Sequence, residues 1–144
     1  MQKHNEKGFS LVELLIVVVI IGIVAALAVP ALERAVIAAE NRNVFATMRT
    51  MNSGQAVFFS QNQRFARLTE LNTVNGNNFG TNAGVRMFRS KFTFEMSPLT
   101  PTDAELRNGY SIGAFRDAGG VTYRYELSSG GVQRILPSID LDTQ

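Results

Sequence analysis

The stretch that decides the fold of this chain lies near its N-terminus and reads GFSLVELLIVVVIIGIVAALAVPAL over residues 8–32. Residues 14–32 carry no charged side chain. As a helix they would be roughly 28 Å long, close to the ~30 Å hydrocarbon core of a bilayer. Lys3 and Lys7 precede the run, and positive charge favours the cytoplasmic side of a membrane. We therefore predict a membrane-spanning helix whose N-terminal end stays in the cytoplasm.

The composition of the chain limits its chemistry. The 144 residues suit one domain with an extension, and the net charge of +2 is too small to indicate nucleic-acid binding by itself. Cysteine is absent, and His4 is the single histidine. If the extreme N-terminus is removed, no Ser-His or Cys-His nucleophile and no thiolate or imidazole metal site can form. We therefore expect a protein that is not an enzyme and has no cofactor.

The apolar run continues into an amphipathic pattern that reaches residue 59. Spacings of three, four and seven separate its apolar residues, as on one face of a helix. These residues are Ile37, Val44, Met48, Met51 and Phe58. The pattern predicts one helix over about residues 9–61, on the order of 80 Å long. Because no compact domain of this size encloses such a helix, we expect it to protrude and the stripe from Ile37 to Phe59 to be buried by neighbouring copies.

The rest of the chain has the pattern of a loop followed by strands. Residues 72–84 are rich in Asn and Gly, which indicates a loop. Alternating or β-prone stretches then predict strands over residues 91–96, 110–115, 121–127 and 132–136. The predicted fold class is α+β, with a long protruding N-terminal helix and a small antiparallel sheet of three to four strands packed on its C-terminal half.

Three interpretations compete for residues 1–32. A secretory signal peptide fits the lysines and the small residues at 26–28, but Pro30 follows the supposed cut and the helical pattern continues past it. A plain membrane anchor explains the apolar run but gives no reason for Glu13. A carboxylate in a transmembrane segment costs ~2.5 kcal/mol or more and usually marks function.

The third interpretation is a family resemblance. Residues 7–30, from Lys7-Gly8-Phe9-Ser10-Leu11-Val12-Glu13 through the apolar run to Pro30, closely resemble the class III signal segment of type IV pilins and their pseudopilin relatives. The resemblance implies three parts: residues 1–8 as a cleaved leader, 9–32 as the transmembrane and filament-core half of the helix, and 33–144 as the amphipathic helix half with a globular sheet head.

The same resemblance implies roles for individual residues. A prepilin peptidase would cut between Gly8 and Phe9 and methylate the new amino group of Phe9. Glu13 would be the fifth residue of the mature chain and would neutralise the N-terminal ammonium of a neighbouring subunit during assembly. Gly22 and Pro30 match the positions between which the helices of family members lose order in the filament, in keeping with their low helix propensity.

Two functions agree with this resemblance. The first is a structural subunit of a bacterial type IV pilus, which waits in the inner membrane and becomes part of an extracellular fibre used in adhesion, motility or DNA uptake. The alternative is the major pseudopilin of a type II secretion system, which forms a periplasmic pseudopilus and acts in protein export. Either role implies copies of the chain itself, the prepilin peptidase and an inner-membrane assembly platform with its ATPase as partners.

Other ligands are weaker expectations. The cationic residues Arg64, Arg67, Arg86, Arg89 and Lys91 could bind DNA, although a solvated surface with a few ion pairs is the simpler interpretation. The Asn/Gly-rich segment 72–84 could contact a surface ligand. Asp140 and Asp142 are calcium candidates because calcium prefers hard oxygen ligands. Paired aspartates near a chain end are more often solvated surface.

Overall fold

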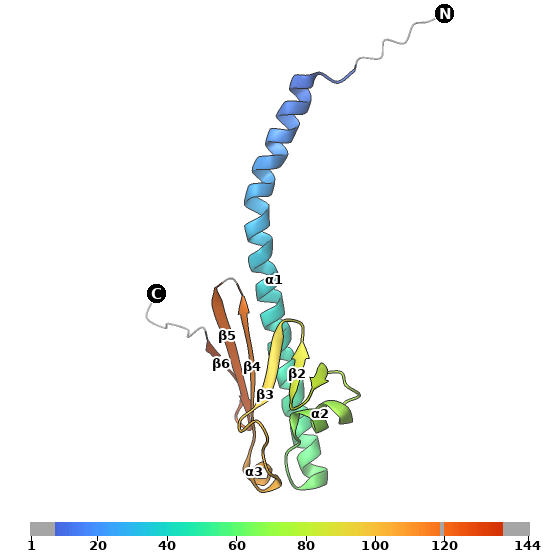
Figure 1. The fold of residues 1–144 in the computed structure, drawn as a ribbon, viewed down its shortest axis with the longest axis vertical. Helices are drawn as coiled ribbons and strands as arrows, with labels where there is room; N and C mark the ends of the chain where they lie inside the picture. Colours follow the sequence, from blue (N-terminus) through green and yellow to red (C-terminus); the bar gives the residue numbers. More distant parts are fainter. Residues whose placement is uncertain (1–7, 119, 137–144) are drawn as a thin grey trace, which may run out of the picture. The chain divides into compact units, whose positions relative to one another are not determined.

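The computed structural model describes residues 8–118 and 120–136. The chain divides into two compact units, Met1–Ala38 and Ala39–Gln144, which we call the N-terminal unit and the head. The division falls inside the first helix, α1, which spans Leu11–Asn62 (Figure 1). Helix and sheet together make the fold α+β, as the sequence predicts.

The N-terminal unit consists of the first part of α1 and the three described residues before it. It is helical because residues 11–29 contain neither proline nor a turn-forming cluster. Helix α1 continues through Gly22 and Pro30 without a break. It is long and apolar enough to cross a membrane, and its most apolar 18-residue window buries none of its residues within the structure.

The head contains the last part of α1, two short helices and one sheet. The helices are α2 (Leu68–Val74) and α3 (Asp103–Asn108), and the strands are β1 (Thr81–Ala83), β2 (Arg86–Arg89), β3 (Phe92–Met96), β4 (Ser111–Ala118), β5 (Val121–Ser128) and β6 (Gly131–Leu136). The strands lie in chain order and every neighbouring pair is antiparallel. The sheet therefore has six strands, where the sequence predicts three to four, because β1 and β2 add a hairpin at one edge.

The core of the head lies between the inner face of the sheet and α1. Strand β3 alternates buried and half-buried residues, as expected of a sheet with one covered face. Phe92, Phe94 and Ile112 from the sheet join Met48 and Met51 from α1, and all five are at most 2% exposed. The β3–β4 pairing holds these positions in register, with Phe94 opposite Ala114 and Met96 opposite Ile112.

This core corrects one expectation from the sequence. The amphipathic stripe was expected to be buried by neighbouring copies, but Val44, Met48, Met51 and Phe58 lie in the hydrophobic core of the chain's own head. They are 0–8% exposed. The expectation is wrong for these four residues. A periodic apolar stripe indicates that one face of a helix is buried but does not identify what buries it, and here it is the sheet of the same chain.

Part of the Asn/Gly-rich segment is ordered by a buried side chain. Asn72 is fully buried on α2, where its amide donates to the carbonyl of Gly80 and to Oδ1 of Asn82, both at 2.9 Å. Its own Oδ1 accepts the N–H of Phe79 at 3.0 Å. The predicted loop over 72–84 therefore begins inside α2 and includes all of β1, and Asn72 fixes the turn between the two elements.

Candidate functional site

The first turn of α1 is capped by Ser10 and Glu13, in an arrangement related to the capping box. Ser10 precedes the helix, and its hydroxyl oxygen accepts the N–H of Val12 at 3.3 Å. In return the N–H of Ser10 donates to Oε2 of Glu13 at 2.9 Å. The sequence Ser10-Leu11-Val12-Glu13 has the S-x-x-E spacing of this motif, which satisfies N–H groups that a helix start leaves unpaired. Glu13 therefore has a local structural role that the sequence analysis did not assign to it.

Gly8 and Phe9 lie immediately before this cap and are exposed. Phe9 is 85% exposed. No heavy atom lies within 4 Å of the position that a Cβ on Gly8 would occupy. Within the described residues nothing covers the peptide bond between Gly8 and Phe9, so a second protein can reach it. It lies four residues before Glu13, the only acidic residue between residues 8 and 32.

After Glu13 the side chains of residues 14–32 form a continuous apolar surface. Its large apolar residues are all exposed, from 45% at Val17 to 73% at Leu27. Soluble monomers rarely expose an apolar patch of more than a few hundred Å². This surface therefore needs a covering of lipid or of other protein chains. Gly22 adds no side chain to it, and an added Cβ there would meet open space.

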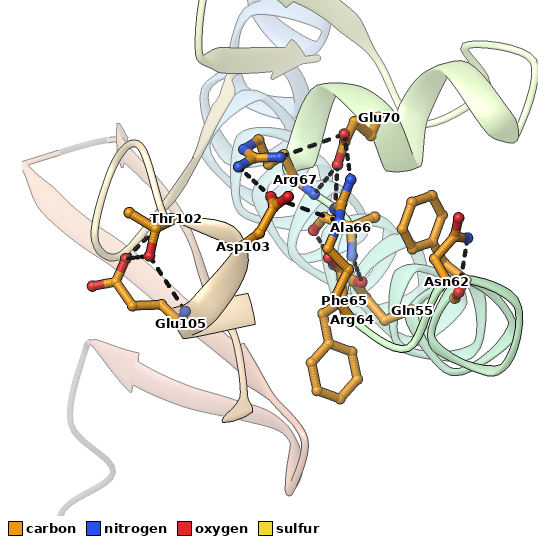
Figure 2. Close-up of polar contacts among 11 residues, drawn as sticks. Gln55, Asn62, Arg64, Phe65, Ala66, Arg67, Glu70, Thr102, Asp103 and Glu105 are labelled. Atoms are coloured by element: carbon orange, nitrogen blue, oxygen red, sulfur yellow. Dashed lines mark hydrogen bonds and ion pairs between the residues drawn. The ribbon is translucent and has the colours of Figure 1, made fainter. Parts of the chain in front are cut away.

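The connection that follows α1 is tied to α2 and α3 by four charged residues (Figure 2). Arg64 binds Glu70 through two nitrogens at 2.8 and 2.9 Å. Arg67 binds Asp103 at 2.6 Å. The hydrogen bond from Arg64 holds the pKa of Glu70 below its usual value against the opposing effect of burial. We call Arg64, Arg67, Glu70 and Asp103 the charged network.

A buried glutamine supports the same junction. The side-chain amide of Gln55 donates to the carbonyl of Ala66 at 2.9 Å, and its oxygen accepts the N–H of Ala66 at 2.7 Å (Figure 2). Both residues are fully buried. Next to them the N–H of Phe65 donates to the carbonyl of Leu106 in α3 at 2.9 Å. These contacts fold the chain back at the end of α1 and position the sheet beside it.

A second ion pair lies deeper in the head. Arg116 on β4 is 4% exposed, binds Glu40 on α1, and has its guanidinium carbon 4.8 Å from the ring centre of Phe92. Lys91 lies 3.7 Å from the same carboxylate. The hydrogen bond from Arg116 is the main reason that the pKa of Glu40 is lowered. Sequence reasoning missed this pair, although the alternation Ile112, Ala114, Arg116 places the arginine on the inward side of its strand.

The cationic residues considered for DNA binding are largely engaged within the head. Arg64 and Arg67 belong to the charged network, Arg86 pairs with Glu95 at 3.0 Å, and Lys91 pairs with Glu40. Arg89 donates to the carbonyls of Asn78 and Phe79. This arrangement agrees with the simpler interpretation of a solvated surface with ion pairs.

For metal ions, residues 8–118 and 120–136 hold no group of three or more His, Cys, Asp or Glu side chains placed to bind one. The calcium candidates Asp140 and Asp142 lie outside the described residues.

Comparison with known proteins agrees with the geometry of the N-terminal unit. Residues 3–29 match the family model described as the prokaryotic N-terminal methylation motif. Searches of curated proteins and of solved structures gave no significant match. The matched motif is the class III signal of type IV pilins and pseudopilins, which confirms the resemblance seen in the sequence. Through this N-terminal segment the chain is similar to type IV pilins and pseudopilins.

Proposed function

We propose that this chain is the structural subunit of a bacterial type IV pilus, cut and methylated by prepilin peptidase and then polymerised into a helical surface filament. One observation carries the proposal: residues 9–32 expose an apolar surface along their whole length and bear a single carboxylate, Glu13, near their start. The methylation motif over the same residues supports it. The subunit is anchored in the inner membrane before assembly and its role is structural.

Processing fits the exposure of residues 8 and 9. Removal of residues 1–8 as a leader leaves the α-amino group of Phe9 two positions before the helix. Because nothing in the described chain covers Gly8 or Phe9, a membrane-embedded peptidase reaches this bond without unfolding the helix. Methylation of Phe9 then acts on an amine that is already free.

Assembly uses the second oxygen of Glu13. Within the described residues only Oε2 of Glu13 is engaged, by the N–H of Ser10. The other oxygen, Oε1, pairs with the ammonium of Phe9 in a neighbouring copy. A carboxylate in an apolar filament core is costly unless it is paired, so this contact selects the register of two helices more than it adds net stability.

Cohesion between copies comes from the apolar surface of residues 9–36. The contact between subunits is heterologous, with one patch meeting a different patch of the next copy, which generates an open helical filament. An inner-membrane platform and its ATPase move the subunit out of the bilayer. The major pseudopilin of a type II secretion system remains the alternative, since the same motif belongs to both families.

The test is to isolate filaments from cells that produce the chain and to examine them by electron microscopy and by mass spectrometry of the N-terminus. The proposal predicts long extracellular fibres whose subunit begins with methylated Phe9. Short periplasmic filaments, together with loss of protein export when the chain is deleted, would indicate the pseudopilus. A subunit that retains residues 1–8 in every assembled form would contradict both roles.

A further inference from the structure

Two opposite charges stand side by side where the uncharged run of α1 ends. Glu33 and Arg34 follow directly after residues 14–32, and both side chains are exposed. The apolar residues on either side of them, Leu32 and Val36, are 65% and 44% exposed. Among residues 8–118 and 120–136 neither charge has an ion-pair partner. Both charges therefore lie on the uncovered surface of the N-terminal unit.

Glu33 and Arg34 cannot pair with each other or with a neighbour on their own helix. Adjacent side chains on a helix point about 100° apart and do not face one another. The residues three and four positions away from either charge are all uncharged. A charge that enters an assembly of apolar helices is costly unless an opposite charge accompanies it. In such an assembly each of these charges therefore requires a partner from another chain.

The register of the Glu13 contact brings the two charges together between copies. When Phe9 of one copy lies level with Glu13 of the next, each residue of the first copy lies level with the residue four positions later in the second. Glu33 of the first copy is then three residues past Arg34 of the second, an axial offset of about 4.5 Å. Packed helices lie about 8–10 Å apart, and charged side chains that flank such a contact form ion pairs between helices.

The two charges also face two different neighbours. Arg34 follows Glu13 by 21 residues, which is three heptads, so the two side chains lie within about 60° of each other around a straight helix. In the assembly Arg34 is thus directed to the neighbour whose Phe9 contacts Glu13. Glu33 lies about 100° away and is directed to a different neighbour. A heterologous contact requires two such different patches on one chain.

We propose that Glu33 and Arg34 form a second charge pair between copies, in which Arg34 of one subunit binds Glu33 of the subunit whose Phe9 contacts its Glu13. This inference rests on the proposed function and identifies a further contact within it. The partner is a second copy of this chain, because the two charges complement each other at the offset that the Glu13 contact sets. The pair fixes the register about 30 Å further along the helix than Glu13.

Charge reversals in cells that make the filament test the pair. Glu33→Arg leaves two cations at this site and Arg34→Glu leaves two carboxylates, so each reversal opposes like charges between copies. Each should lower the yield of sheared filaments at least about tenfold, because like charges opposed across an interface cost more than one tenfold step in affinity. The double swap Glu33→Arg/Arg34→Glu restores opposite charges between copies and should recover most of the wild-type yield.

Production of the two single variants in the same cells tests whether the pair joins different chains. The Glu33→Arg copy presents only cations at this site and the Arg34→Glu copy presents only carboxylates, so alternating copies satisfy every contact. The mixture should form filaments although neither variant does so alone. Mass spectrometry of the sheared filaments should find both variants in similar amounts.

Arg107→Glu is the matched control. Arg107 is exposed on α3 and has no ion pair among the described residues, and its reversal changes the net charge by the same amount as Arg34→Glu. This variant should leave the filament yield unchanged. A mature N-terminus at Phe9 in every variant would show that membrane insertion and processing are intact.

Normal filaments from either single reversal would overturn the charge pair. An equal loss of filaments in Arg107→Glu would do the same, because the effect would then follow net charge and not this contact. The pair would also be wrong if the double swap assembled no better than the single variants, or if the mixture failed where the double swap succeeded. Failure of the proposed function is distinct, since the wild-type chain itself would then form no filaments.

Discussion

Two parts of the same helix differ in what covers them. In residues 9–36 the large apolar side chains are 44–85% exposed, whereas those of α1 that join the core of the head are 0–8% exposed. Both stretches are rich in Val, Ile, Leu, Met or Phe, so composition does not explain the difference. In the head, the six-stranded sheet of the same chain covers the apolar face of α1. The proposed function assigns the covering of the N-terminal unit to lipid before assembly and to other copies afterwards.

The strongest test of this difference is to produce the head without the N-terminal unit. A chain that begins at Ala39 should be a soluble monomer that unfolds cooperatively, because the core residues of the head all lie in or after the second part of α1. Size-exclusion chromatography and near-UV circular dichroism without detergent would measure this. Aggregation, or loss of the tyrosine signal, would show that the head depends on the N-terminal unit.

Within α1 a matched pair of substitutions should separate covered from uncovered positions. Met48→Ala removes a fully buried side chain and should lower the unfolding free energy of the head by about 2–5 kcal/mol through lost burial and a cavity. Val57→Ala, at a position that is 58% exposed, should cost less than about 0.5 kcal/mol. Chemical denaturation of both variants gives the comparison, and similar losses would contradict the assignment of the core.

A smaller effect is expected from the glutamine that folds the chain back after α1. Gln55→Ala leaves the buried N–H and carbonyl of Ala66 without partners and should destabilise the head by about 1–3 kcal/mol. Denaturant unfolding would measure it, with Gln61→Ala as the control because Gln61 is exposed on the same helix. An unchanged midpoint for Gln55→Ala would mean that water replaces the amide.

The smallest effect concerns acid. The pKa of Glu70 is lowered in the folded head, chiefly by the hydrogen bond from Arg64. The ionised carboxylate therefore stabilises the head at pH values above the pKa that Glu70 has in the unfolded chain. This stabilisation is lost as the pH falls through the lower pKa of the folded head. A partly exposed pair contributes up to about 1 kcal/mol. Melting temperatures from pH 7 down to pH 3 should therefore fall less steeply in Glu70→Gln than in the wild-type head. Glu33→Gln, in the N-terminal unit, should follow the wild-type profile.

Much of this architecture can be predicted from sequence, for physical reasons that vary along the chain. The uncharged residues 14–32 and the helical spacing that ends at Phe58 predict α1, and period-two alternation predicts strands β3 and β5. The sequence analysis does not predict the β1–β2 hairpin, because its strands are only three and four residues long. The turn that leads into β1 also depends on the buried side chain of Asn72, which no local pattern indicates.

The polar contacts of the core were harder to predict. Alternation along β4 places Arg116 inward, but its partner Glu40 is 76 residues away in sequence, and no local pattern reports that pairing. The role of Glu13 shows the same limit at short range. The S-x-x-E spacing is present in the sequence, but the resemblance to pilins indicates a role for Glu13 in assembly and not in capping its own helix.

Glu13 therefore offers the most direct test of the central claim, which is that the N-terminal unit is completed by other copies. Glutamine can replace glutamate in a capping box but carries no charge. The measurement is the yield of sheared filaments from cells that produce Glu13→Gln, with processing followed by mass spectrometry of the N-terminus. The account predicts a mature N-terminus at Phe9 and almost no filaments. Normal filaments from Glu13→Gln would contradict it, because Glu13 would then act only as the cap of its own helix.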